Sequence, residues 1–201
     1  MLDAIKYSLA NLGRIEGRDS RGTFWYYVLF LVILQFVVGL IVSLPIYISM
    51  FTVIFDATAS GGDPNVAMQG MFEDLVSQIR SQMAVSMIVG VVIGLMLIAS
   101  FVRRLHDAGY TGWIVLVPLA TQAFSIIYAY TFMDRMGEIM LENMTAGFDG
   151  ASGGGPDPFA LQAEMGCLGL VGWIGYIVVI GFGVLKSQEG PNQYGEGPVR
   201  F

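Results

Sequence analysis

The stretch Phe101-Val-Arg-Arg-Leu-His-Asp-Ala-Gly-Tyr-Thr-Gly-Trp113 decides how this chain folds, because it is a short polar segment between two long uncharged apolar runs. It contains His106, the only histidine of the sequence, and two of the ten basic residues. Ionisable side chains are costly inside a bilayer. The segment therefore predicts a turn at the membrane surface that joins two spanning helices.

The composition supports a membrane protein, since 55% of the residues are hydrophobic and only 13% are charged. Windows without Asp, Glu, Lys, Arg or His cover residues 24–55, 83–102, 113–133 and 165–185. Each supplies the roughly 20 apolar residues that a helix needs to cross the hydrocarbon core. We predict an all-α integral membrane protein, a four-transmembrane-helix bundle with spans at about 24–48, 83–102, 113–133 and 165–185, in one domain of residues 1–201.

The basic residues predict the orientation, because lysine and arginine gather on the cytoplasmic side of inner-membrane proteins. If the N-terminus is cytoplasmic, that side carries most of the basic residues, and Arg80 and Arg135 lie outside. The cytoplasmic set is Lys6, Arg14, Arg18, Arg21, Arg103, Arg104, Lys186 and Arg200. We expect a multi-pass protein of the bacterial inner membrane with both termini in the cytoplasm. Its net charge of −6 is contributed mainly by the outer loops and does not indicate nucleic-acid binding.

Residues 56–82 and 134–164 form the expected outer loops, and both carry helix signals. Asp63-Pro64 and Asp157-Pro158 are typical helix starts. Apolar residues then recur at helical spacing: Met68, Phe72, Leu75, Ile79 and Met83 in the first loop, and Met133, Met136, Met140, Met144 and Phe148 in the second. They predict amphipathic helical extensions on the periplasmic side. Methionine thioethers also suit Cu(I), but such stripes are usually packing faces, so we predict no metal and no cofactor.

Small and polar residues within the spans predict how the helices meet. Ser86, Gly90 and Gly94 recur every fourth residue, a pattern that lets helix backbones approach closely, and Gly166, Gly169, Gly172 and Gly175 line the last span. Gln35 and Gln122 lie near the middle of the first and third spans. An amide in hydrocarbon needs a partner, so we expect both glutamines to face the bundle interior, bonded to each other in one arrangement.

Three motifs resemble one family. Gly17-Arg-Asp-Ser-Arg-Gly-Thr-Phe-Trp25 is similar to its "GRxSRxxFW" segment, the 103–113 segment to its "RRLHDxGxSGW" elbow, and Gly190-Pro-Asn-Gln-Tyr-Gly-Glu-Gly-Pro198 to its "GxNxYGxxP" tail. The chain thus resembles the YhaH-like bacterial inner-membrane proteins, domain of unknown function 805. The long outer loops and Gln193, where arginine is common, are departures. The resemblance implies location and topology but no activity.

All three motifs fall on the predicted cytoplasmic side, so their polar residues are the candidate site. The set is Arg18, Arg21, Arg103, Arg104, His106, Asp107, Asn192 and Tyr194. One hypothesis is structural, with arginines at the interface and Asp107 paired to one of them. A second is recognition of an anionic group by guanidinium forks. A third, catalysis, is disfavoured because a neighbouring His-Asp pair supplies no nucleophile.

These observations favour a non-enzymatic membrane component that binds lipid headgroups or a protein partner through the cytoplasmic Arg/His/Asp cluster. The alternative is a small-molecule or ion translocator that acts as an oligomer. No charged residue lies in mid-span to serve as a coupling site, which disfavours translocation by a single chain. The expected partners are membrane lipids, and a membrane protein or a second copy of the chain stays open.

Overall fold

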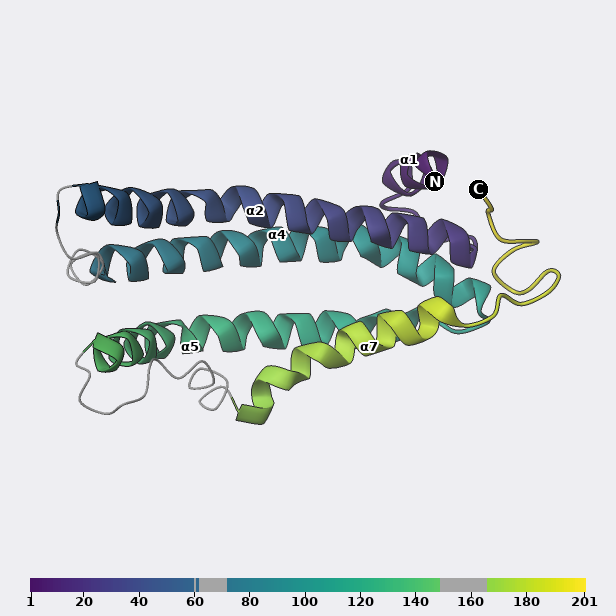
Figure 1. The fold of residues 1–201 in the computed structure, drawn as a ribbon. Coiled ribbons are helices and arrows are strands. Elements are labelled where there is room, and N and C mark those ends of the chain that lie inside the picture. Colours follow the sequence, from purple (N-terminus) through teal and green to yellow (C-terminus); the bar gives the residue numbers. More distant parts are fainter. Residues whose placement is uncertain (60, 62–71, 149–165) are drawn as a thin grey trace. The chain divides into compact units, whose positions relative to one another are not determined.

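The computed structural model describes residues 1–59, 61, 72–148 and 166–201. The chain runs through α1 (Leu2–Ala10), α2 (Arg21–Ala59), α4 (Phe72–Asp107), η1 (Gly112–Val115), α5 (Leu116–Phe148), η2 (Gly166–Leu170) and α7 (Val171–Val184) (Figure 1). Every named element in these residues is helical, and the only strand-like pairs are two isolated bridges, Asp19 with Val199 and Asn192 with Gly195. The predicted all-helical class is confirmed.

Three helices are long and apolar enough to cross a membrane: Arg21–Ala59, Ser77–Asp107 and Gly112–Phe132. The first two contain the first two predicted spans and extend beyond both of them at each end, and the third matches its predicted span to within one residue. α7 is equally apolar but has only 14 residues, and the 3-10 helix η2 precedes it. The membrane character of the chain therefore rests on three helices, and a fourth crossing through η2 and α7 stays a prediction.

The turn expected over residues 101–113 is shorter than the sequence suggested, because α4 continues to Asp107. Gly109, with a φ of 83°, ends the helix in the left-handed conformation that glycine adopts without strain. Gly109 N–H donates to the His106 carbonyl and Tyr110 N–H to the Leu105 carbonyl, which is a Schellman cap. Arg103, Arg104 and Asp107 are consequently fixed on the last turn of a helix.

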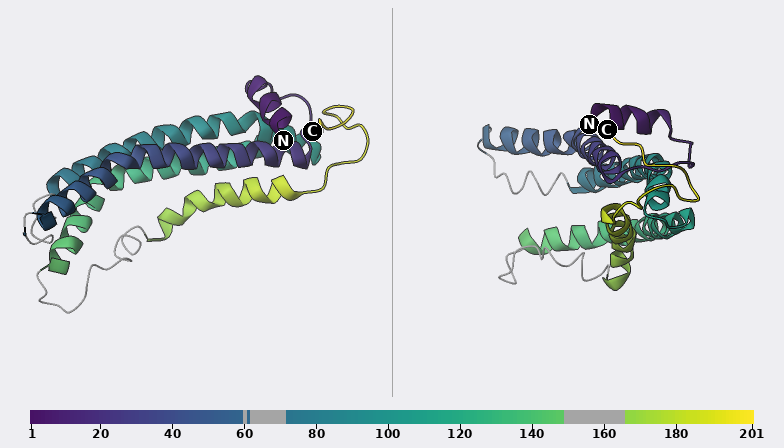
Figure 2. Two further views of the ribbon diagram at one scale, coloured as in Figure 1. Left: turned by 45° about the horizontal axis from the view of Figure 1, so that its top comes forward. Right: turned by 90° about the vertical axis from the view of Figure 1, so that its right-hand side faces the viewer.

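The chain consists of two compact units, each assembled from segments that are distant in the sequence. Unit 1 comprises residues 1–38, 88–125 and 170–201, and unit 2 comprises residues 39–87 and 126–169. Within unit 1 the first part of α2 runs beside the last part of α4, and both chain ends lie near α1 (Figures 1 and 2). Tyr7 and Phe201 join these ends, with ring centroids 5.6 Å apart.

The core of unit 1 is formed by Phe24, Phe101 and Leu105, which are almost completely buried. Residues of α2, α4, η1 and α7 pack around them, among them Trp25 and Val179. The core thus lies directly under the polar segment at the end of α4. Burial of these side chains holds α2 against α4 at the level of Arg103 and Arg104.

The two predicted glycine faces differ. In α7, a Cβ at Gly172 would come within 2.6 Å of Ser125 Oγ, and one at Gly175 within 2.5 Å of Thr121 Oγ1, so α7 and α5 are in close contact there. In α4, a Cβ at Gly94 would meet no atom within 4 Å, and one at Gly90 only the Gln122 amide at 3.9 Å. The expectation of close helix packing is correct for α7 and wrong for Gly94, which borders open space.

Several predictions concern residues outside the described ranges. The helix starts Asp63-Pro64 and Asp157-Pro158 lie there, as does Met68. α5 carries helical backbone through Met133, Met136, Met140, Met144 and Phe148, but side chains of this stripe also lie outside what the structure describes. The periplasmic extensions and the packing of the methionine stripes therefore stay predictions.

Replacing Gly175 with alanine is expected to destabilise unit 1, because the added methyl group would lie 3.1 Å from the Pro118 Cα, part of a backbone that cannot rotate away. Overpacking of this kind costs about 1–3 kcal/mol. The matched control is Gly181→Ala in the same helix, whose Cβ would meet nothing within 4 Å. Unfolding by SDS in mixed micelles measures both variants; equal midpoints would show that the α5–α7 contact is not close.

Candidate functional site

Asp107 binds two arginines that come from different parts of the chain. Arg18 Nε and Nη2 donate to its Oδ1 over 3.2 and 3.1 Å, and Arg104 Nη1 donates to its Oδ2 over 2.5 Å. All three side chains are fully buried. α4 supplies Arg104 and Asp107 one turn apart, so they lie on one face of the helix. Arg18 reaches them from the segment between α1 and α2.

The donors that remain on Arg18 and Arg104 are used by backbone carbonyls in and after the last turn of α7. Arg18 donates to the carbonyls of Gln188 (2.6 Å), Gly190 (2.7 Å) and Gly195 (3.3 Å). Arg104 donates to the carbonyls of Gly183 (3.2 Å) and Leu185, the latter being the C-cap of α7. Cations at a helix C-terminus satisfy carbonyls that have no helical partner.

A second buried pair lies beside the first. Arg103 Nε donates to Asp19 Oδ1 over 2.9 Å, and Ser100 Oγ donates to Asp19 Oδ2 over 3.0 Å. Arg103 Nη1 donates to the carbonyls of Asn11 and Arg14 and so fixes the segment after α1. Burial raises the pKa of the Asp19 carboxyl above its ordinary value, while the Arg103 charge and the hydrogen bonds from Arg103 and Ser100 oppose the rise.

One guanidinium nitrogen in this arrangement lacks an acceptor. Arg103 Nη2 is buried and makes no hydrogen bond within the described chain. The Arg103 Cζ lies 5.4 Å from the centroid of the Tyr7 ring, which is within cation–π range. The Tyr7 ring is thus a cation–π partner of this guanidinium group.

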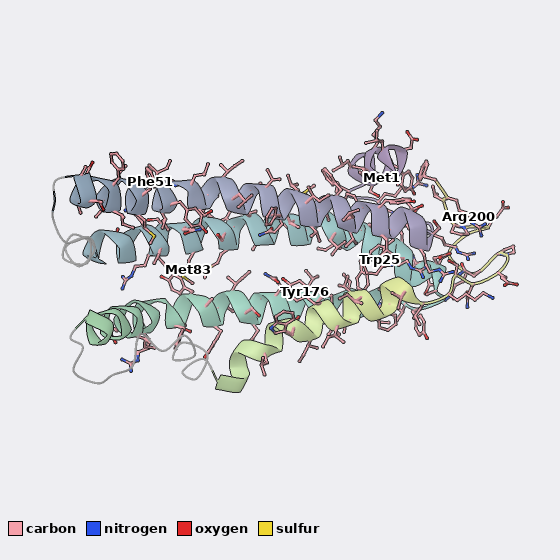
Figure 3. All side chains as sticks on the ribbon, viewed as in Figure 1. Met1, Trp25, Phe51, Met83, Tyr176 and Arg200 are labelled. Carbon is pink, nitrogen blue, oxygen red and sulfur yellow. The ribbon has the colours of Figure 1, made fainter. Side chains whose placement is uncertain are left out.

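We call Arg18, Asp19, Arg103, Arg104 and Asp107 the arginine clasp. It brings three segments together: residues 11–19, the end of α4, and the tail from Gly183 to Gly195. Backbone bonds join the same segments, as Asp19 N–H donates to the Arg103 carbonyl, Gln188 N–H to the Asp107 carbonyl, and Val199 N–H to the Arg18 carbonyl. Figure 3 draws the side chains at the end of unit 1 where Met1, Trp25 and Arg200 are labelled.

His106, Asn192 and Tyr194 lie at the edge of the clasp. The rings of His106 and Tyr194 stack with centroids 3.8 Å apart and planes 6° from parallel. Asn192 Nδ2 donates to the His106 carbonyl over 2.9 Å, and its Oδ1 accepts from Tyr194 N–H over 2.9 Å. His106 is thus held by stacking on the tail. Its Nδ1 is buried without a hydrogen-bond partner in the described residues.

Most of the sequence-predicted residues are brought together. Six of the eight candidates form two groups: Arg18 and Arg104 meet at Asp107, and His106, Asn192 and Tyr194 contact one another. Arg103 is bonded to Asp19, which was not predicted, and Arg21 begins α2 with an exposed side chain. Asp19 and Ser100 were not among the residues predicted from the sequence. A signal existed, because the buried arginine pair Arg103-Arg104 needs more negative charge than Asp107 alone supplies, and Asp19 lies inside the first motif.

Gln35 and Gln122 lie in a different place, on the wall of a cavity of about 470 Å³ within unit 1. They share that wall with apolar residues of α2, α4, α5 and α7. In the described part of the chain no hydrogen bond joins the two amides; the Gln35 side chain is exposed and that of Gln122 half-buried, so the expectation that both face the bundle interior stays a prediction.

The arrangement resembles a structural lock more than a binding pocket for an anion. The donors of Arg18 and Arg104 are directed at the chain's own carboxylate and carbonyl oxygens. Removing one member of such a buried pair leaves an uncompensated charge. As for metals, the residues that the structure describes contain no group of three or more His, Cys, Asp or Glu side chains suited to hold an ion.

Comparison with known proteins gives a family without an assigned activity. A family model described as "Protein of unknown function (DUF805)" matches residues 12–196. The match includes every residue of the clasp and nearly all of the three motifs. No curated protein and no solved structure matches the chain.

Replacing Asp107 with asparagine is expected to lower the unfolding free energy by about 3–5 kcal/mol, because Arg18 and Arg104 would both lose their counter-charge in a buried site. Glu189→Gln is the matched control, since Glu189 pairs with Lys186 over 2.8 Å in an exposed position, where such pairs contribute little. SDS titration of purified protein in micelles gives both values. Comparable losses for the two variants would contradict the structural role of the clasp.

Proposed function

We propose that this chain, which belongs to the DUF805 family of proteins of unknown function, is a non-enzymatic component of the bacterial inner membrane that binds anionic lipid headgroups at its cytoplasmic end. It crosses the membrane four times, with both termini in the cytoplasm. The apolar helices support the membrane location, and the excess of arginine and lysine near the predicted cytoplasmic ends supports the orientation.

The observation that carries the proposal is the division of the basic residues into two groups. The buried arginines of the clasp are committed to the protein's own oxygen atoms. Lys6, Arg14, Arg21 and Arg200, by contrast, have exposed side chains on the segments that the clasp holds together. The clasp therefore fixes the segments that carry these four exposed cations, and the cations bind the anionic headgroups. This moves the recognition of anions away from Arg18, Arg103 and Arg104.

Exposed apolar groups beside these cations support contact with a bilayer. α1 exposes Leu2 (67%) and Leu9, and Trp113 is 75% exposed at the start of η1. Tryptophan is typical of the headgroup region, and a short amphipathic helix lies along it. Arg14 and Arg21, which flank the entry of the chain into α2, are well placed for lipid phosphates.

The headgroup assignment is tested by measuring phospholipid retained through purification. We expect the double variant Arg14→Gln/Arg21→Gln to lose affinity for anionic lipid by about fivefold per charge removed. Lys186→Gln is the control, because Lys186 already pairs with Glu189. Native mass spectrometry of protein in nanodiscs of phosphatidylglycerol and phosphatidylcholine reports the bound lipid.

Retention of anionic lipid unchanged in the double variant would refute the headgroup site. The headgroup site would also be refuted if the double variant lost a bound protein and not a bound lipid, since an acidic protein partner would then occupy the surface. Arg104→Gln separates binding from folding, because it is expected to lower stability through the clasp while the exposed cations stay in place.

The topology is tested with single cysteines in a Cys167→Ser background. An impermeant maleimide added to intact cells is expected to label Thr58→Cys, at the far end of α2, and to label Gln193→Cys only after permeabilisation. Both positions are exposed in the folded chain. Labelling of Gln193→Cys in intact cells would place the tail outside and reverse the orientation.

A further inference from the structure

The cavity in unit 1 has the size of a ligand site, at about 470 Å³. α2, α4, α5 and α7 all contribute to its wall, and most of the lining is aliphatic. Three aromatic side chains, Trp25, Phe101 and Tyr176, are also part of the lining; Figure 3 labels Trp25 and Tyr176. Four separate helices thus surround a volume that their side chains do not fill.

The wall of the cavity contains two polar amide side chains, which imperfect packing of apolar helices does not by itself account for. Gln35 and Gln122 both line the cavity, Gln35 with an exposed side chain and Gln122 with a half-buried one, and neither makes a hydrogen bond to any part of the chain that the structure describes. Gln35 comes 14 residues after Arg21, which is roughly 20 Å along the helix and so at the depth of the hydrocarbon core. An unpaired amide in such surroundings is unfavourable, so a group with hydrogen-bonding atoms is expected there.

The lining also restricts the ligand's chemistry. None of its described residues is charged, so nothing compensates a phosphate, a carboxylate or an ammonium group. The acyl chain of a phospholipid fits the apolar walls but offers no atom to the amides at this depth. The ligand therefore carries oxygen on a largely apolar, uncharged body.

We infer that the cavity binds an uncharged, membrane-soluble lipid with a planar oxygen-bearing ring, of the lipophilic quinone class. Its ring carbonyls accept hydrogen bonds from the Gln35 and Gln122 side-chain N–H groups. The ring therefore lies roughly 15 Å along α2 from Trp25, at the level of the α7 turn that carries Gly175 and Tyr176 and packs on Thr121, and the apolar tail follows the aliphatic wall. This site is independent of the exposed cations, so it stands whether or not these bind lipid headgroups.

The glycines of α4 keep this space open. A Cβ at Gly94 would project into a region with no atom within 4 Å, and Gly90 would bring one to ordinary contact distance of the Gln122 amide. A leucine at position 94 therefore fills the cavity without displacing a neighbouring atom at its Cβ. Gly181 is the matched control, because its Cβ also meets nothing and it does not line the cavity.

The test uses Trp25 as the reporter, since Trp25 lines the same cavity and a quinone bound there quenches tryptophan fluorescence at short range. The chain has three tryptophans, and Trp113 and Trp173, at 75% and 64% exposure, lie outside the lining. In the Trp113→Phe/Trp173→Phe background, the full-length protein in nanodiscs is titrated with a decyl-substituted benzoquinone. We expect quenching that saturates, and no displacement of the quinone by decylbenzene at equal concentration.

The variants assign the binding to the cavity. Gly94→Leu is expected to abolish the saturable quenching, and Gly181→Leu to preserve it. Gln35→Leu and Gln122→Leu are each expected to weaken binding roughly three- to tenfold, the range for one hydrogen bond in a membrane. Size-exclusion profiles and far-UV circular dichroism confirm that each variant is folded. If Gly94→Leu fails this check, the two glutamine variants decide alone.

Two results would overturn the inference. Quenching that rises linearly without saturation, and equally in Gly94→Leu and Gly181→Leu, would mean that the quinone only partitions into the bilayer. Saturable quenching with the same affinity in both glutamine variants would mean that the space accepts any apolar chain and that the amides recognise nothing.

Discussion

The bridge that Asp107 makes between Arg18 and Arg104 is the interaction on which this end of the protein depends. It joins a residue before α2 to two residues of α4, and both arginines then hold carbonyls at the end of α7 and in the tail that follows it. A buried carboxylate between two guanidinium groups is tolerable only if every charge and donor is compensated. This condition explains why the tail winds back over the clasp, where its carbonyls are accessible to the arginines.

The clasp packs on a small apolar core and includes the last turn of the long helix α4. Its charges depend on the core, and its geometry depends on the helix end. Phe24, Phe101 and Leu105 keep water away from the charges, which strengthens their attraction and raises the cost of leaving one unpaired. The Schellman cap at Gly109 stops α4 immediately after Asp107, so the arginines are displayed on a rigid turn. Because the buried arginines are fixed in this way, the exposed cations around the clasp are available to bind other molecules.

The sequence allowed the elements and the meeting of the three motifs to be predicted, for identifiable reasons. Charge-free windows are a direct consequence of the cost of charge in lipid, so the first three spans were evident. The extent of α4 was underestimated, because arginines were taken as signs of a turn when pairing with the buried Asp107 makes them compatible with a helix. Carbonyl acceptors could not be predicted, since a backbone oxygen carries no signature in the sequence.

The central claim, that the clasp locks residues 11–19, the end of α4 and the tail into one body, is tested most directly by hydrogen exchange. The amides of Asp19, Gln188 and Val199 donate across these segments to the carbonyls of Arg103, Asp107 and Arg18. Exchange measured by mass spectrometry is predicted to be slow at all three and to accelerate together in Arg18→Gln. Exchange in the wild-type tail at the rate of an unstructured peptide would contradict the account.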